Sequence, residues 1–301
     1  MAGNLERALA VLELLAKNGG RMPLAAIADT LNIPRSGTHR LLSMLIEEGF
    51  VRQDEDHGEY MLALKLVSLA LIYLSTSGVF DISQPVLDRL AETSGELARL
   101  GVVEDDHLTF VGKAQGAKSG LRYDPDMGSQ PPLHCTASGQ AWLSSLPDER
   151  AIELVSKQGG LGPKAHNAPR APKTIQQFLK DLNGARQRGY GVAIETYEVG
   201  MTSIAAAVRN PVTGEVVGIV SLAGPTSRLP EARLKELAPL VLEAASDMGA
   251  ATLSSPYFRQ ASKAAAPADQ PAEGAKKAGA RTAPFLRRNL TCNRAGGSWW
   301  M

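Results

Sequence analysis

The stretch that decides the fold lies at residues 24–62 and reads LAAIADTLNIPRSGTHRLLSMLIEEGFVRQDEDHGEYML. Two segments in it place apolar residues at the spacing of a buried helical stripe. These residues are Leu24, Ile27, Ala28 and Leu31 in the first segment, and Leu41, Leu42, Leu45 and Ile46 in the second. Pro34 fits the first turn of a helix and disfavours helix in the residue before it, so Asn32-Ile33-Pro34 separates two helices. Residues 51–62 read as a hairpin around Asp56-His57-Gly58, which predicts a winged helix-turn-helix.

The polar face of the second helix predicts a DNA-reading surface. No acidic residue occurs between Asp29 and Glu47. A helix that presents small polar and basic groups from its N-terminal half fits a DNA major groove. The side chains predicted to contact DNA are Arg35, Ser36, Thr38, His39, Arg40, Ser43 and Arg52. We expect His39 to be half-buried or to contact phosphate. Two short helices around a proline also occur in all-α domains, but the hairpin and a preceding helix favour DNA binding.

That preceding helix carries one apolar stripe and ends at Asn18-Gly19-Gly20. Its stripe consists of Leu5, Ala8, Leu9, Leu12, Leu15 and Ala16. After the hairpin, residues 62–74 are apolar nearly all round, with Lys65 as the only charge. Thirteen residues are too few to span a bilayer, so we expect a helix buried by a second subunit or by the following domain, and favour a linker helix at a dimer interface. A DNA reader of this type needs two copies to cover two half-sites.

Two blocks of sequence resemble one family of bacterial transcription factors. The first comprises LERALAVL at 5–12, IPRSGTHRLL at 33–42 and EGFV at 48–51. The second comprises PLHCTASGQA at 132–141, GYGV at 189–192 and VGIVSLAGPTSR at 217–228. Both are similar to the isocitrate lyase regulator (IclR) family. The resemblance implies an α+β protein with a winged helix-turn-helix at 1–62, a linker helix at 63–78 and a GAF-like α/β effector domain at 79–255.

The residues of the second domain agree with that architecture. We expect hairpins at 97–114, around Glu104-Asp105-Asp106, and at 203–223, around residues 210–214. A helix should open near Ser83 with Pro85 in its first turn, and further helices are expected at 137–145, 148–157, 175–188 and 231–253. Hairpins that alternate with helices give an α/β sheet with helices on one or both faces.

The resemblance also places an effector pocket in this domain, bounded by the loop before residue 141, the strands at Ser203 and Ser221, and the segment after Tyr190. The effector-binding residues that it implies are Leu133, Cys135, Ala141, Glu195, Ser203, Ser221, Ala223 and Arg122. Leu133 and Ala141 would form pocket wall, and Ser203 and Ser221 would supply polar contacts. Free amides at the helix start near Thr136 could receive a carboxylate.

Two departures from the family pattern make the pocket less polar than one for a glyoxylate-sized acid. Ala223 stands where a serine is frequent, and Ala193-Ile194 precede Glu195 where an acidic pair is frequent. An aromatic or larger organic acid is therefore the preferred ligand. Arg99 and Arg122 could pair with its carboxylate, although an arginine on a strand is more often part of a solvated face.

Two other functions are compatible with parts of the sequence. Cys135 follows His134 at a predicted helix start, where a thiolate would be stabilised, and this pair is the feature that a hydrolase-like enzyme would use. No oxyanion site or third triad member accompanies this pair, which favours packing or pocket lining for Cys135. The effector domain could also be a dimerisation module without a ligand. We predict a non-enzymatic regulator of operator DNA without cofactor or metal, either a repressor or an activator, assembled as a homodimer or a dimer of dimers.

Composition and charge add further expectations. Residues 1–62 hold six basic and nine acidic side chains, a net charge of −3, so we expect modest non-specific DNA affinity and reliance on oligomer avidity. The cysteines Cys135 and Cys292 show no metal or disulfide pattern. No signal peptide opens the chain, so a cytoplasmic location without membrane contact is expected. Residues 256–301, with a net charge of +6 and no apolar periodicity, predict a disordered basic tail.

Overall fold

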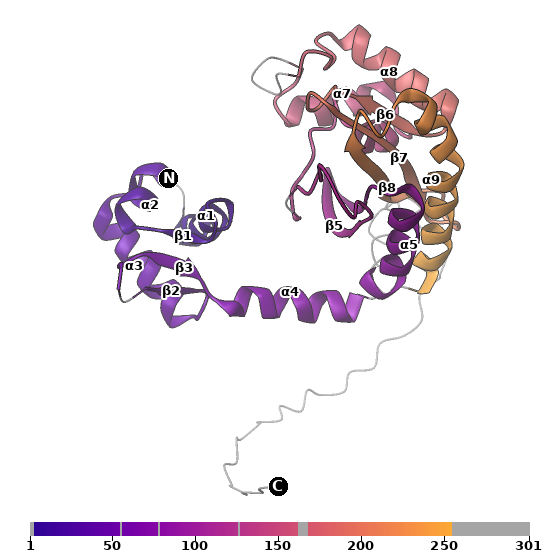
Figure 1. Ribbon diagram of the computed structural model, residues 1–301. Helices are drawn as coiled ribbons and strands as arrows, with labels where there is room; N and C mark the ends of the chain where they lie inside the picture. The colour runs from indigo at the N-terminus through magenta and orange to yellow at the C-terminus, as the bar shows by residue number, and fades with distance from the viewer. Residues whose placement is uncertain (1–2, 55, 78, 126, 162–167, 255–301) are drawn as a thin grey trace, which may run out of the picture. The chain divides into compact units, whose positions relative to one another are not determined.

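The computed structural model (Figure 1) describes residues 3–54, 56–77, 79–125, 127–161 and 168–254. The predicted disordered tail at 256–301, with Cys292, lies outside the described residues. The chain contains an N-terminal helix-rich unit, an apolar helix after it, and an α/β unit built on an antiparallel sheet. In the described part of the chain, no helix has the length and apolar character needed to cross a bilayer.

The N-terminal unit has the predicted winged helix-turn-helix. Its helices are α1 (Asn4–Lys17), α2 (Leu24–Leu31) and α3 (Arg35–Glu47). Its wing is β2 (Val51–Gln53) paired with β3 (Tyr60–Leu62), and β1 (Arg21–Met22), which sequence reasoning missed, adds a third strand in the order β1-β3-β2. Asn32 adopts the left-handed conformation (φ 51°) and ends α2. The turn therefore forms where the sequence predicted it.

The core of this unit is smaller than the apolar stripes suggested. Its buried residues are Val11, Leu15, Ile27, Leu42, Leu45, Val51 and Tyr60. Leu5 and Leu9 were assigned to the buried stripe of α1, yet they are 75% and 51% exposed. Ile46, assigned to the stripe of α3, is also exposed. Short helices of this unit bury only the turns that face one another, so apolar side chains at their margins stay in solvent.

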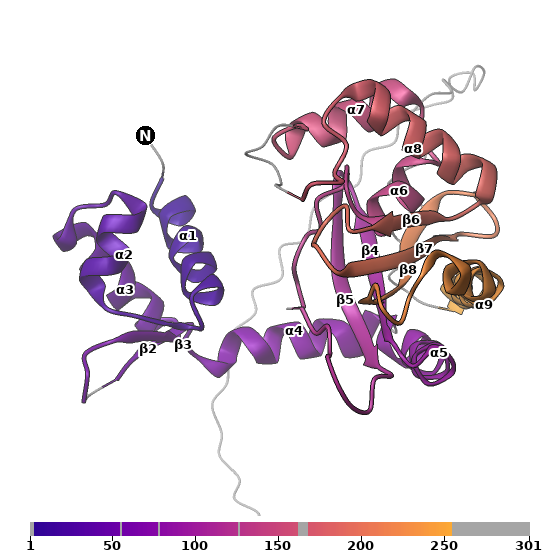
Figure 2. The same cartoon turned by 45° about the horizontal axis from the view of Figure 1, so that its top comes forward.

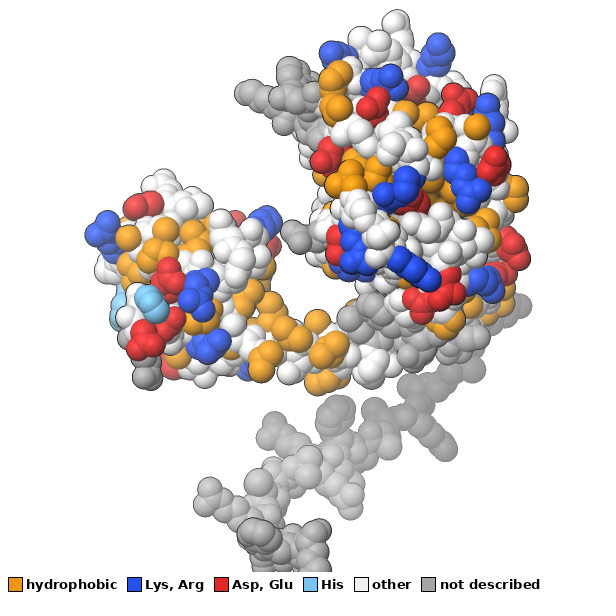
Figure 3. Space-filling view, viewed as in Figure 1, with side chains coloured by type: hydrophobic (Ala, Val, Ile, Leu, Met, Phe, Trp, Pro, Cys, Tyr) orange, Lys and Arg blue, Asp and Glu red, His pale blue; other side chains and the backbone are white. Residues whose placement is uncertain are grey.

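The apolar helix α4 (Leu64–Ser77) is present over the range expected of the linker. Its described side chains are largely exposed, including Val67 (50%), Leu71 (61%) and Ile72 (62%). Figure 3 shows the apolar side chains gathered along this helix. A helix that exposes this much apolar surface is typical of one that packs against a partner.

The α/β unit is a five-stranded antiparallel sheet in the order β5-β4-β8-β7-β6. The strands are β4 (Leu97–Glu104), β5 (His107–Gln115), β6 (Gly191–Ile194), β7 (Met201–Arg209) and β8 (Val216–Pro225). The two predicted hairpins, β4-β5 and β7-β8, are both confirmed. The short strand β6 pairs with β7 at the edge and was not predicted as a strand.

Helices cover both faces of this sheet (Figures 1 and 2). One face packs against α5 (Val79–Ser94) and α9 (Glu231–Ala251), and the other against α6 (Ala137–Leu143). The helices α7 (Asp148–Lys157) and α8 (Ile175–Arg188) lie on the α6 side, and a 3₁₀ turn, Thr252–Ser254, follows α9. The helix predicted to open near Ser83 begins at Val79, so Pro85 lies inside α5 and not in its first turn.

Two glycines allow α6 to approach the sheet closely. A Cβ atom at Gly139 would overlap the carbonyl oxygen of Leu133, and one at Gly191 would overlap the carbonyl oxygen of Ala137. Thr136 caps the helix, as expected, because its Oγ1 accepts a hydrogen bond of 3.1 Å from the Gly139 amide. The start of α6 is thereby fixed beside the strands that carry the candidate pocket.

Candidate functional sites: an exposed helix face and a cavity beside the sheet

The N-terminal half of α3 presents a polar, basic surface. Arg35, Ser36, His39 and Arg40 are all exposed on it, and Arg52 is exposed on β2. Two other basic residues of the same unit are engaged with acids, because Lys17 pairs with Glu13, and Arg21 lies 3.5 Å from Asp54 and 3.8 Å from Glu59. Arg35 and Arg40, by contrast, are exposed and form no ion pair with the described residues, so both are available to an anionic partner.

One predicted contact residue, Thr38, has a different environment from the one expected. Thr38 is fully buried, and its Oγ1 donates to the carbonyl oxygen of Pro34 at 3.3 Å. It faces the core under α3, so the expectation that it touches DNA is wrong for this structure. Ser43 is half-buried. His39 is exposed, so of the two expectations for it the phosphate contact remains a prediction.

The tip of the wing is ordered by an acidic side chain. Asp54 Oδ1 accepts a hydrogen bond of 3.0 Å from the Asp56 amide, and Oδ2 lies 3.4 Å from His57 Nδ1. The backbone hydrogen bond is the main reason why the pKa of Asp54 is lowered, and desolvation partly opposes it. The carboxylate therefore stays charged, which makes this tip a poor partner for phosphate and leaves Arg52 as the basic group of strand β2.

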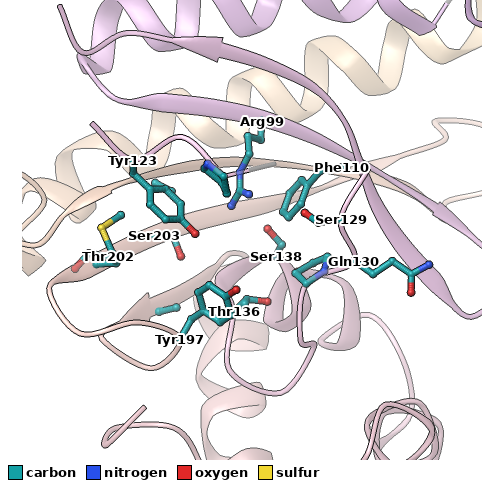
Figure 4. Close-up of a pocket in the computed structure, with 15 residues that line it drawn as sticks. Arg99, Phe110, Tyr123, Ser129, Gln130, Thr136, Ser138, Tyr197, Thr202 and Ser203 are labelled. Carbon is teal, nitrogen blue, oxygen red and sulfur yellow. The ribbon is translucent and has the colours of Figure 1, made fainter. Parts of the chain in front are cut away.

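A cavity of about 80 Å³ lies between the sheet and the loop that connects β5 to α6. Its volume is several times what one water molecule needs. Figure 4 shows Arg99, Phe110 and Ser203 entering it from three strands, with Thr136 and Ser138 on the opposite side. The residues that line it are Arg99, Phe110, Tyr123, Pro125, Ser129, Gln130, Pro131, Thr136, Ser138, Ala193, Tyr197, Met201, Thr202, Ser203 and Ala223. None of these fifteen is acidic.

The loop over this cavity is held by hydrogen bonds at several points. Gln115 Nε2 donates to the carbonyl oxygen of Tyr123 at 3.0 Å. Arg228 forms a bidentate pair with the buried carboxylate of Glu96, at 2.6 and 2.8 Å, and donates to the carbonyl oxygen of Leu121 at 2.9 Å. These contacts fix the segment that brings Tyr123 and Pro125 to the cavity.

The structure brings only part of the predicted pocket together. Ser203 and Ala223 line the cavity, as expected. Leu133 and Ala141 instead pack in the hydrophobic core between α6, α7 and α8. Arg122 is exposed, and its Nε donates to the carbonyl oxygen of Ala117, in the same loop, at 2.8 Å.

Two further predicted residues are not among those that line the cavity. Glu195 lies in the β6–β7 turn with φ 54°, where Oε1 accepts from the Gly200 amide and Oε2 lies 3.2 Å from Arg170. Ser221 is buried on β8, and its hydroxyl has no hydrogen-bond partner among the described residues.

Cys135 is fully buried among Ala168, Ala171 and Tyr197. Burial raises the pKa of its thiol to about 12, so the side chain is neutral at physiological pH. The thiolate nucleophile on which the hydrolase alternative depended is therefore not favoured here.

Sequence reasoning missed the aromatic residues of the cavity, Phe110, Tyr123 and Tyr197. Phe110 and Leu108 are both buried on β5 and alternate with half-buried Thr109, so a register assignment could have placed Phe110 on the inward face. The two tyrosines lie in irregular segments, and no periodic signal marks them.

Comparison with known proteins accounts for both units. Residues 4–55 match the IclR helix-turn-helix domain, and residues 71–250 match the domain described as bacterial transcriptional regulator IclR C-terminal. The chain belongs to the IclR family. It is thus a DNA-binding transcriptional regulator, with a helix-turn-helix that binds operator DNA and a C-terminal domain for a small-molecule effector.

Curated and solved relatives agree with this family. The HTH-type transcriptional repressor AllR of Escherichia coli (strain K12) is 32% identical over 82% of this chain and 89% of its own. The IclR transcriptional regulator from Alicyclobacillus acidocaldarius has a TM-score of 0.72 at 22% identity, over 83% of this chain and 98% of that one. An IclR homolog from Microbacterium hydrocarbonoxydans, complexed with 4-hydroxybenzoate, has a TM-score of 0.69 at 23% identity, over 84% and 100%. At these identities the two structures support the fold alone.

Proposed function

We propose that this IclR-family regulator binds operator DNA through the exposed face of α3 and that a small organic acid in the cavity beside the sheet changes that binding. The corresponding division is a DNA-binding unit at 1–62, a linker at 63–78 and an effector domain at 79–255. We further propose that the protein acts in the cytoplasm, where bacterial operator DNA lies.

The exposure of Arg35, Ser36, His39 and Arg40 on one face of α3 carries the DNA-binding part of this proposal. The opposite face of the helix is anchored by Leu41, Leu42 and Leu45 in the core. A helix fixed in this way can present its N-terminal side chains to base edges without losing its packing. Arg35 and Arg40 have the donors to reach guanine edges or phosphates, and Ser36 and His39 are the smaller polar contacts. Arg52 is the proposed phosphate contact of the wing.

The composition of the cavity supports an acid as the effector. None of the described residues that line it is acidic and one of them, Arg99, is an arginine, so these side chains attract an anion. Phe110, Pro125, Pro131, Ala193, Met201 and Ala223 give the wall a large apolar share. A hydrocarbon body with one carboxylate fits this combination. The ligand of the IclR homolog complexed with 4-hydroxybenzoate is an acid of this chemical class, which makes an aromatic acid a natural probe for this chain.

We also propose a homodimer formed through α4, with a dimer of dimers as the larger assembly. The exposed apolar side chains of α4 would lose their contact with water in such a dimer. A two-fold dimer also places two copies of α3 on two half-sites, which compensates for the net charge of −3 of residues 1–62.

A gel-shift titration tests this proposal with the full chain and the DNA upstream of its own gene. We expect a retarded complex whose apparent affinity changes on addition of one of glyoxylate, isobutyrate, benzoate or 4-hydroxybenzoate. A complex that none of these acids affects, together with no thermal stabilisation by any of them, would favour the effector domain as a dimerisation module without a ligand.

A further inference from the structure

Arg99 is a buried cation that forms no ion pair with the residues that the structure describes. It lies on β4, is 8% exposed, and its guanidinium points toward the middle of the cavity (Figure 4). Its Nε has no hydrogen-bond partner among the described residues. The guanidinium carbon lies 3.8 Å from the centre of the Phe110 ring and 5.8 Å from that of Tyr123. The guanidinium group of Arg99 thus lies against aromatic rings, at a place where a buried arginine usually has a carboxylate.

Such an arrangement is costly for the empty protein. A buried charge without an ionic partner is penalised by desolvation, which is also the main reason why the pKa of Arg99 is lowered. A cation–π contact recovers part of that cost but supplies no hydrogen-bond acceptor. A bound anionic ligand would supply the counter-charge and the hydrogen-bond acceptors that Arg99 lacks.

A second unsatisfied group lies beside it. Ser221 on β8 is the register partner of Arg99 in the β4-β8 pair, so the two side chains project from the same face of the sheet. The Ser221 hydroxyl is buried and has no partner among the described residues. Two neighbouring polar groups left unsatisfied at one place on the sheet are rare in a finished core. Arg99 lines the cavity, and Ser221 lies next to it on the sheet but is not among the lining residues, so Arg99 marks the polar end of the cavity.

We propose that Arg99 is the specificity-determining residue of the effector cavity and anchors a monocarboxylate through its guanidinium. This inference rests on the proposed function, and it adds the residue and the chemical class. One fixed positive charge selects a monoanion, and the planar guanidinium matches a carboxylate in a bidentate arrangement. Phe110 holds the guanidinium plane from one side, and the hydrocarbon part of the ligand lies against the apolar wall and the two tyrosines. Arg122, the other arginine that could be considered, is exposed and lies outside the lining.

Thermal unfolding of the full chain tests this role with paired probes. The pairs are isobutyrate and isobutyramide, benzoate and benzamide, and 4-hydroxybenzoate and 4-hydroxybenzamide, each acid beside its neutral isostere. We compare wild type, Arg99→Met and, as the matched control, Arg122→Met. For wild type and Arg122→Met, at least one acid raises Tm, while its amide does not. Arg99→Met weakens the binding of that acid by more than tenfold, measured by calorimetric titration.

Stability without ligand separates an anchor from an arginine that only packs. If Arg99 serves to bind the carboxylate of a ligand, Arg99→Met should have a Tm equal to or above that of wild type in the absence of acid, because the substitution removes an uncompensated buried charge. The order of the two Tm values then reverses at saturating acid. A lower Tm for Arg99→Met without acid, combined with unchanged acid affinity, would overturn the inference while the proposed function stands. Failure of every acid to stabilise wild type would instead contradict the proposed function itself.

Discussion

Arg228→Ala is predicted to destabilise the effector domain by removing the partner of a buried carboxylate. The Glu96 side chain is 4% exposed, and both of its oxygens accept hydrogen bonds from Arg228, at 2.6 and 2.8 Å. Removal of one partner of a fully buried pair costs about 3–5 kcal/mol. Arg228 is itself 35% exposed, so we expect a loss of about 2–4 kcal/mol, since solvent screens part of the interaction. The variant also loses the hydrogen bond to Leu121 and with it one support of the loop over the cavity.

Urea titration followed by the fluorescence of Trp142, which is buried in this domain, measures the loss. Trp299→Phe and Trp300→Phe in all samples leave Trp142 as the only tryptophan. Arg233→Ala is the control, because Arg233 and Glu236 form an exposed pair worth about 1 kcal/mol or less. Glu96→Gln added to Arg228→Ala should restore part of the stability, since it removes the stranded charge. If Arg228→Ala and Arg233→Ala lower the free energy of unfolding equally, the reasoning is refuted.

Three further predictions concern single side chains. Gly37→Ala should stabilise the winged unit by about 0.5–1 kcal/mol, because alanine has a higher helix propensity than glycine and its methyl group would meet only Ile33 Cγ2, at 3.4 Å. A thermal melt measures this change, and a lower Tm for the variant would contradict the prediction. Thr38→Val should leave operator affinity unchanged, since the side chain is buried and cannot reach DNA, and a loss of more than threefold would show that it does. In the native protein the Cys135 thiol should resist iodoacetamide at pH 8.5 and react only after unfolding, because its pKa of about 12 keeps it protonated. Peptide mapping measures the alkylation, and rapid modification of Cys135 in the native protein would contradict the prediction.

Elements with strong local signals were predictable from sequence. The helix α8 has the bounds expected for it, because Thr174 caps its start, and Gly189, with φ 81°, ends it. The start of α5 was placed too late, because Pro85 was interpreted as a first-turn residue. The helix instead tolerates Pro85 in its interior, where packing against β4, β5 and α9 determines its extent. Strands β1 and β6 are too short to show alternation, and only pairing with β3 and β7 defines them.

The two candidate sites differed in how far sequence could locate them. On α3 one helical period decides which side chains face outward, and only Thr38 was placed on the wrong side. The cavity is assembled from five strands, the loop after β5, the β6–β7 turn and a helix start, so its lining depends on register and on the loop path. Leu133 was expected in the wall from the resemblance to the family, but its side chain packs in the core. Arg99 was considered as a ligand partner, yet only the structure shows that it is buried and lacks an ion-pair partner for its charge among the residues lining the cavity.

Fluorescence anisotropy of labelled upstream DNA, titrated with full-length Arg40→Ala and Lys17→Ala proteins at several salt concentrations, tests the central claim most directly. The account predicts that Arg40→Ala loses about 1–3 kcal/mol of operator binding relative to Lys17→Ala, because a side chain on the reading face of α3 has been removed. Both variants should keep the thermal response to acid seen with wild type. Equal operator affinities for Arg40→Ala and Lys17→Ala, at every salt concentration, would contradict the claim that this face of α3 binds DNA.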